Sequence, residues 1–572
     1  MKTRTKKSVS IVFLIAMFFC VSGMAQPSHP DVLKAREFTN SEQFDSAKEA
    51  FEALLKSQPT NGDVYFYYGE NYLIEYYSDT AYTSKKSAIK EAEILFVKAM
   101  EVDPENTAGY VGMGKICLMK NDDLSAEKYF NDAQAKFPSK TNKTSTIQPD
   151  KQARTLAKIA ESYLIIQGKK NVAKALKLLE QAIELDGKNA ELYLIYGDAF
   201  LENNDGSNAI SQYKMAQELN PKSPSAKLRL GNLWIRARNW QEAIDYYKEA
   251  IGIDSTFAPA YLELGKLYSK ANQLELSMQN YKKYLDISTN VSAKIKYVNV
   301  LIESDNHKEA INQLNEIVKT DTTRNDLNRA FAYCYYETAD YQNALQYITK
   351  FFKNTVPEKT LVNDYIYYGK ILSKNNKDSL AITKFQEAFA LDSNQYDIFS
   401  ELANSYTRMK NYAKAAENYE KKIAKDKAGT ADYYRLGVVY YNYGTVEKNI
   451  NIWKKADTTF AYLTENKPDF MNGKSMFYRA IINSMIDTLT NTHNAKPLFE
   501  SYIERVKADS VKYANDLVSC YDYLASYYFL GAEKDICKAR YFWNKILMLK
   551  PDNEKALDML KETKNHPCPD QK

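Results

Sequence analysis

Histidine, glycine and proline are scarce in this sequence. Its 572 residues include only 4 His, 19 Gly and 15 Pro, a composition that favours long helices over many short strands and turns. None of the histidines lies near another, and only His566 has a cysteine close by, so metal binding and histidine-based catalysis have little support. Serine-nucleophile and zinc-protease motifs are also missing. We therefore expect no enzymatic activity and no cofactor.

An excess of charge of one sign is missing as well. The chain has 77 Lys and Arg against 72 Asp and Glu, and four of the basic residues lie within the first seven positions. Without that short segment, 73 basic residues face 72 acidic ones, which is a net charge of +1. A chain with this balance has no general electrostatic attraction for nucleic acid or for an acidic membrane surface, so we expect no nucleic-acid partner.

Long hydrophobic runs are confined to the N-terminus. A basic stretch precedes the apolar segment from Val9 to Val21, and small residues follow up to Ala25. This order is typical of a secretory signal peptide over residues 1–25 that is cleaved after Ala25. The apolar segment is too short to span a bilayer comfortably, and Cys20 follows Phe19 where a lipoprotein signal needs a small residue. We expect an exported protein without a transmembrane segment, either periplasmic or peripherally associated with the outer membrane.

What the sequence does contain is a repeat of 34 residues. Small residues recur at this interval in two runs, which are Gly197, Gly231 and Gly265, and then Gly369, Ala403 and Gly437. Most of these residues are followed by Ala or Ser twelve positions later and by an aromatic residue sixteen positions later. Around Gly197 the frame consists of Tyr193, Phe200, Ala209, Tyr213, Ala216 and Pro221.

The frame has a direct physical interpretation. Small residues such as Gly197 and Ala209 let two antiparallel helices approach closely, while aromatic residues such as Phe200 and Tyr213 fill the space between one helix pair and the next. Pro221 ends the second helix. A single pair cannot bury its apolar face, so the pairs must stack into a row.

The frame resembles that of the tetratricopeptide-repeat (TPR) family, whose repeat is also 34 residues long. The resemblance implies an all-α fold, a right-handed superhelical solenoid of about fourteen helix-turn-helix repeats. A last amphipathic stretch over residues 553–564 is predicted to be a C-terminal capping helix. The chain looks similar to the exported TPR arrays of Bacteroidota.

The repeats divide the chain as follows. We expect a signal peptide over 1–25, three repeats over 26–138, a polar linker over 139–150, four repeats over 151–286, degenerate repeats over 287–360, three repeats over 361–468, divergent repeats over 469–551, and the capping helix with its tail over 552–572. Extra residues precede Ala92 and Ala456, and we expect these two insertions to lengthen helices.

The family's binding surface is a concave groove, to which the first helix of each pair contributes residues three before and one after the small residue. Three before, the sequence has an apolar row: Phe66, Val111, Leu194, Leu228, Leu262, Ile366 and Tyr434. One after, it has a mixed polar row: Glu70, Lys115, Asp198, Asn232, Lys266, Lys370 and Asn404. Such rows suit an extended peptide or a partner helix. The leading hypothesis is therefore a non-enzymatic protein-binding scaffold of the cell envelope, with the oligomeric state left open.

Two alternatives remain at this point. The apolar row could serve only to fill the space between repeats. Glycan or cell-wall binding is the second alternative, through exposed tyrosines such as Tyr76, Tyr77, Tyr82, Tyr441 and Tyr443.

A short pattern also recurs in which Asp precedes Ser or Thr and a further residue that is mostly apolar. It resembles the periplasmic O-glycosylation motif of Bacteroidota, although turns favour the same dipeptides. The hydroxyl residues are Ser46, Thr80, Ser255, Thr322, Ser379, Thr458, Thr488 and Ser510.

The mature chain has five cysteines, which is an odd number for an oxidising compartment. Cys117, Cys334 and Cys520 are predicted to be buried core thiols. The capping helix should end near the start of the preceding helix, so we hypothesise a disulfide between Cys537 and Cys568. Free or intermolecular thiols are the alternative.

Overall fold

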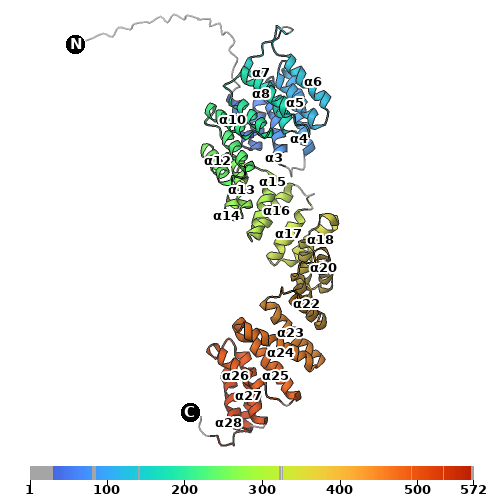
Figure 1. Cartoon of the computed structure of the whole chain (residues 1–572), viewed down its shortest axis with the longest axis vertical. Helices are drawn as coiled ribbons and strands as arrows, with labels where there is room; N and C mark the ends of the chain where they lie inside the picture. Colours follow the sequence, from blue (N-terminus) through green and yellow to red (C-terminus); the bar gives the residue numbers. More distant parts are fainter. Residues whose placement is uncertain are drawn as a thin grey trace, which may run out of the picture. The chain divides into compact units, whose positions relative to one another are not determined.

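The computed structural model describes residues 30–79, 85–139, 142–320, 324, 326–490, 492–531 and 534–568. Within these ranges the chain forms 29 α-helices and three short 3-10 helices, and no strand (Figure 1). The first 28 α-helices make fourteen antiparallel pairs, which confirms the expected all-α array. The predicted signal peptide over 1–25 lies outside the described residues. The chain divides into two units, Met1–Thr323 and Arg324–Lys572, which are described separately.

Unit 1 contains eight helix pairs. Its helices are α1 (Pro30–Asn40), α2 (Phe44–Ser57), α3 (Gly62–Ser78), α4 (Lys85–Val102), α5 (Thr107–Met119), α6 (Asp123–Ala135), α7 (Pro149–Ile165), α8 (Val172–Leu185), α9 (Ala190–Glu202), α10 (Gly206–Leu219), α11 (Ser225–Arg236), α12 (Trp240–Ile253), α13 (Ala258–Lys270), α14 (Leu274–Leu285), α15 (Val291–Glu303) and α16 (His307–Thr320).

Unit 2 contains six further pairs and a last single helix. Its helices are α17 (Leu327–Glu337), α18 (Tyr341–Asn354), α19 (Val362–Lys374), α20 (Asp378–Leu391), α21 (Asp397–Arg408), α22 (Tyr412–Ala424), α23 (Thr430–Glu447), α24 (Ile450–Asn466), α25 (Lys474–Thr490), α26 (Ala495–Val506), α27 (Ala514–Leu530), α28 (Ile536–Leu549) and α29 (Glu554–Glu562). The 3-10 helices are η1 (Pro357–Lys359), η2 (Phe470–Gly473) and η3 (Lys507–Asp509).

In five of the pairs, a glycine of the first helix lies against the aromatic residue sixteen positions later; these glycines are Gly114, Gly197, Gly231, Gly265 and Gly369. A Cβ built on Gly197 would lie 2.4 Å from the ring of Tyr213, and one on Gly369 would lie 2.4 Å from the ring of Phe385. Both rings are fully buried. The side chain of Tyr213 also packs with Leu230 of the next pair. The aromatic residue therefore joins its own two helices as well as neighbouring pairs.

A residue in the left-handed conformation turns the chain between the two helices of most pairs. It lies seven positions after the small residue, for example at Asn204 (φ 59°) and Asn272 (φ 55°). Asparagine tolerates this conformation better than most residues. The next residue caps the second helix: the carboxylate of Asp205 accepts a hydrogen bond from the backbone N–H of Asn208 at 3.1 Å.

The insertions lengthen helices. α3 and α4 have 17 and 18 residues, and α23 and α24 have 18 and 17. Most other helices of the array have between 11 and 14 residues, as in α9 with 13 and α10 with 14.

The C-terminal helix α29 lies where the capping helix is predicted. Beyond it, Cys568 forms a disulfide with Cys537 at the start of α28, and the two Cα atoms are 5.4 Å apart. This is the pairing that the sequence suggests. Cys334 and Cys520 are buried free thiols, and Cys117 is half-buried.

Candidate functional site

In the first repeats, the residues predicted to line the groove are buried by packing between neighbouring helix pairs. Phe66 and Val111 are 2% and 1% exposed, so these two members of the apolar row fill space between repeats. Glu70 and Lys115 of the polar row are equally buried, and they form an ion pair at 2.8 Å. These four side chains are therefore not available to a partner of the folded protein.

Charged side chains also bridge first helices that are far apart in the sequence. The guanidinium of Arg36 on α1 lies 2.7 Å from the carboxylate of Glu191 on α9. Between them, the ammonium group of Lys158 on α7 contacts Glu191 at 3.2 Å and Glu70 at 3.5 Å. Burial raises the pKa of Glu191, but the charges of Arg36 and Lys158 outweigh this effect and leave it well below its usual value. This inner face is held together by its own charges.

The polar row has a second internal role. The hydroxyl of Tyr213 donates a hydrogen bond to Asp198 at 2.7 Å, and Asp198 also pairs with Arg229 at 2.9 Å. Tyr247 donates in the same way to Asn232 at 2.7 Å. A tyrosine sixteen positions after the small residue therefore orients the polar residue one position after it. This contact could have been predicted from the sequence, because a tyrosine and a polar residue recur at this fixed spacing.

The remaining members of unit 1 are only partly accessible. Leu194 and Leu228 are half-buried and pack against buried hydrophobic side chains of neighbouring helix pairs. Leu262 is buried. Lys266 is 31% exposed and pairs with Glu263 on its own helix at 2.5 Å.

In unit 2 none of the four predicted residues is fully buried. Ile366 and Lys370 on α19, Asn404 on α21 and Tyr434 on α23 are all half-exposed. Lys370 lies 3.9 Å from Glu401. Asn404 Oδ1 accepts a hydrogen bond from Tyr419 at 2.7 Å, and among the described residues its amide nitrogen donates none.

Aromatic side chains continue this face beyond α21. The ring of Tyr434 contacts those of Phe470 and Tyr478, with centroids 5.7 and 5.9 Å apart, and Tyr441 also contacts Tyr478 at 5.8 Å. Burial raises the pKa of Tyr434. Successive first helices of unit 2 thus present apolar, cationic and amide groups.

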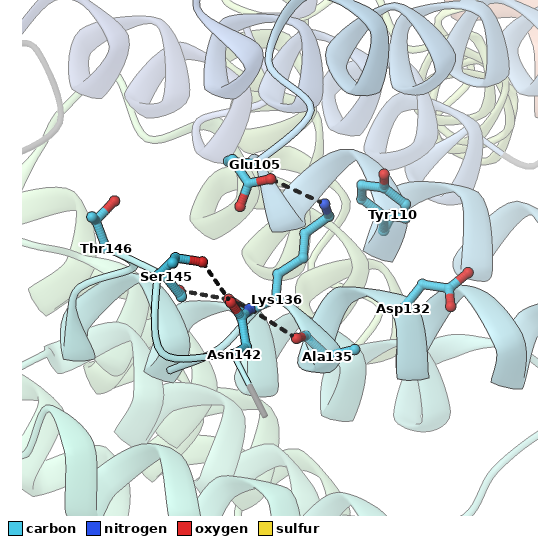
Figure 2. A pocket seen from close by; sticks show the side chains of 9 residues that line it. Glu105, Tyr110, Asp132, Ala135, Lys136, Asn142, Ser145 and Thr146 are labelled. Carbon is cyan, nitrogen blue, oxygen red and sulfur yellow. Dashed lines mark hydrogen bonds and ion pairs between the residues drawn. The ribbon is translucent and has the colours of Figure 1, made fainter. Parts of the chain in front are cut away.

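A polar hollow of about 530 Å³ lies beside the C-terminal end of α6. Figure 2 shows Lys136 pointing between Glu105 and the ring of Tyr110, at 3.7 Å from the carboxylate and 4.9 Å from the ring centroid. Asn142 and Ser145 donate hydrogen bonds to the carbonyl of Lys136. These groups satisfy one another and cap the helix.

A second hollow of about 500 Å³ is more apolar and lies among α22, α23 and α24. Its walls include Leu436 and the stacked rings of Tyr433 and Tyr462, whose centroids are 4.5 Å apart. Asn451 and Lys454 lie at its edge.

The tyrosines expected as glycan platforms are not fully exposed. Tyr76, Tyr441 and Tyr443 are half-buried, and the hydroxyl of Tyr77 is buried, whereas Tyr82 lies outside the described residues. Of the Asp-Ser and Asp-Thr motifs, Thr80 and Thr322 lie outside these residues too. The others reach the surface: Ser46, Ser255, Ser379, Thr458 and Thr488 are exposed and Ser510 is half-exposed.

Groups suited to chemistry are sparse. No cluster of three or more His, Cys, Asp or Glu that could hold a metal ion occurs among the described residues. Burial raises the pKa of the Cys334 thiol to about 12 and also raises that of Cys520. Thiols of this kind are protonated at neutral pH and are poor nucleophiles.

Sequence models of the tetratricopeptide repeat match residues 32–73, 168–224 and 204–260, and a second model of the same repeat matches 258–290. The chain belongs to the TPR family. TPR proteins are typically protein-binding scaffolds and usually non-catalytic. No helix in the described part of this TPR chain is long and apolar enough to cross a membrane.

The chain is also similar to several solved structures. The C-terminal part of a TPR repeat-containing protein from Cytophaga hutchinsonii is 31% identical, covers 46% of this chain and 98% of its own, and has a TM-score of 0.41. Cut9, in its complex with Hcn1, is 12% identical over 71% of this chain and 95% of its own, with a TM-score of 0.31. Yeast Tom70 is 13% identical over 73% and 96%, with a TM-score of 0.26. No curated protein matches the chain.

Proposed function

We propose that this TPR chain is a non-enzymatic scaffold that binds an extended peptide or a partner helix on the first-helix face of unit 2. One observation carries the proposal. None of the four predicted groove residues of unit 2 is buried, whereas five of the ten in unit 1 are, and Glu70 and Lys115 among these form an ion pair.

The chemistry of this face suits a polypeptide. Ile366 and Tyr434 offer apolar contacts to alternate side chains, and Lys370 offers a cation. The amide nitrogen of Asn404, which donates no hydrogen bond within the described part of the chain, can donate to a main-chain carbonyl. Extended peptides are held by main-chain hydrogen bonds together with contacts for selected side chains.

We further propose that the scaffold works in the cell envelope, in the periplasm or peripherally associated with an outer-membrane complex. The proposal rests on the N-terminal segment, whose basic, apolar and small-residue regions have the order of a secretory signal peptide. Partners should then be envelope proteins.

Affinity capture from the cell envelope tests the binding face. The tagged mature protein is compared with Ile366→Glu/Tyr434→Glu and with the control Leu380→Glu, which places the same charge at a 57% exposed position on α20. We expect the control to retain the partner and the double variant to lose it by about tenfold or more. Equal retention by all three proteins, at unchanged helix content, would contradict the proposal.

Glycan binding remains the second candidate, because the hollow between α22 and α24 combines stacked tyrosines with amide and ammonium groups. Sugars bind through such aromatic faces and polar edges. Retention on isolated cell wall that is lost in Tyr462→Ala and kept in Tyr541→Ala would favour this function. Tyr541 is a fair control because it is 44% exposed and Tyr462 is 45% exposed.

A further inference from the structure

The two ends of unit 1 contact each other, although more than 200 residues separate them in the sequence. The turn between α1 and α2 and the C-terminal end of α3 lie against the turn before α13, against α14 and against the start of α15. Figure 1 shows α3 beside α15. We call these contacts the clasp. It consists of Glu42, Gln43, Asp45, Ser78 and Asp79 on one side, and of Thr256, Tyr284 and residues 289–292 on the other.

Asp79 forms the centre of the clasp. The residue is 3% exposed, and its carboxylate accepts hydrogen bonds from the backbone N–H groups of Val291 at 2.7 Å and Ser292 at 3.0 Å. The hydroxyl of Ser292 donates a third bond to it. These are the contacts of a helix N-cap, but here the capping side chain comes from a helix twelve elements earlier. An acidic group at a helix N-terminus is also favoured by the helix dipole.

The insertion before α4 explains how Asp79 reaches this place. It lengthens α3 to 17 residues, and Asp79 follows the last residue of that helix. The backbone carbonyl of Ser78, at the same end, accepts a hydrogen bond from the side chain of Asn290 at 3.2 Å. The extra residues therefore bring a cap and an acceptor to α15.

A second contact lies on the other side of the clasp. The fully buried Tyr284 donates a hydrogen bond to the carboxylate of Glu42 at 2.5 Å. Gln43 donates to the carbonyl of Thr256 at 3.4 Å, and Thr289 donates to Asp45 at 3.2 Å. Two separated segments thus hold the same pair of ends together.

We infer that unit 1 is a closed superhelical turn, and that the clasp withholds its inner face from partners. The ion pairs of Arg36, Lys158 and Glu191 span that face and occupy the charged groups that a partner would otherwise contact. A partner can reach these first helices only when the clasp opens. The inference concerns unit 1 alone and does not depend on what unit 2 binds.

Disulfide trapping tests the closure. Asp45→Cys and Thr289→Cys are introduced together into the full mature chain with Cys117→Ser, because both positions are exposed and their side chains are in contact. We expect rapid, complete formation of an intramolecular disulfide under mild oxidation. Adding Asp79→Ala should slow trapping by about tenfold or more, since a buried, charge-assisted cap is lost.

The matched control is Asp205→Ala, which removes a cap that serves only its own helix α10. It should leave the trapping rate unchanged. Glu42→Ala removes the other contact and should slow trapping as well, which keeps the test available if Asp79→Ala lowers the helix content. Absence of the disulfide in the otherwise intact chain, or trapping that neither substitution slows, would overturn the inference.

Lysine acylation with N-hydroxysuccinimidyl acetate tests whether the inner face is withheld. Lys158 has a side chain that is 12% exposed, and Lys98 on the outer surface of α4 is 50% exposed. We expect slow acylation of Lys158 relative to Lys98, faster acylation in Asp79→Ala, and renewed protection once the engineered disulfide closes. Acylation of Lys158 as fast as that of Lys98 in the unmodified chain would contradict a sequestered inner face.

Discussion

Replacing Gly231 by alanine should destabilise the array, although the same replacement usually stabilises a helix. A Cβ at Gly231 would lie 2.4 Å from the ring of Tyr247. The ring cannot move away easily, because it is fully buried and its hydroxyl is bonded to Asn232 at 2.7 Å. Gly252 lies in the neighbouring helix α12 and has no atom within 4 Å of the corresponding position. It is therefore the matched control.

The magnitudes follow from two opposing effects. Alanine in place of a helical glycine contributes about 1 kcal/mol of stability, and this applies to both positions. Forcing a methyl group into a packed core costs about 1–3 kcal/mol, and this applies only to Gly231. The Gly231→Ala variant should thus be less stable than Gly252→Ala by about 1–3 kcal/mol.

Hydrogen exchange of the peptides from α11 and α12 measures this difference locally, without assuming that the whole chain unfolds in one step. Faster exchange in Gly231→Ala than in the unmodified chain, together with slower exchange in Gly252→Ala, is the expected result. Equal protection in the two variants would refute the close-packing argument.

Three further predictions concern charge, oxidation and processing. Glu191 has a lowered pKa in the folded chain, so its contribution to stability is present above the ordinary glutamate pKa and is lost as the pH falls through the folded value. The Glu191→Gln variant should therefore show a flatter acid side in a plot of stability against pH. An unchanged curve would contradict the ion-pair assignment. Non-reducing peptide mapping should recover Cys537 joined to Cys568, whereas two free thiols would exclude the disulfide. The intact mass of the exported protein should correspond to a chain beginning at Gln26; added hexose masses would indicate glycosylation, and a retained leader would contradict cleavage after Ala25.

The sequence was sufficient to predict the helix pairs. The 34-residue spacing of small residues and the aromatic residue at a fixed offset both report local packing between neighbouring helices. α29 and the partner of Cys537 follow from the same regularity, because each added pair repeats the geometry of the one before it.

The closure of unit 1 could not be predicted in this way. It depends on the total twist that accumulates over seven helix pairs, and no short sequence pattern predicts this total. The nearest signal is the insertion that ends at Asp79, which a strictly local analysis interprets only as a longer helix. Its contact with Val291 becomes visible only in three dimensions.

The candidate site was predicted in part for a related reason. Residue positions relative to the small residue identify the first-helix face, but they do not say whether that face is open. Opposite charges lie at equivalent positions of successive repeats at Glu70 and Lys115. Such a pattern predicts that the two side chains pair with each other, as they do. Arg36 carries no such signal, since its partner Glu191 lies four pairs away.

Photo-crosslinking in the cell envelope tests the central claim most directly. Benzoylphenylalanine is placed at Lys370 of unit 2 or at Lys266 of unit 1; both positions follow the small residue of a first helix, and the native side chains are 33% and 31% exposed. We predict protein adducts from position 370 and none from position 266. Adducts at position 266 alone, or equally at both positions, would contradict a binding face confined to unit 2.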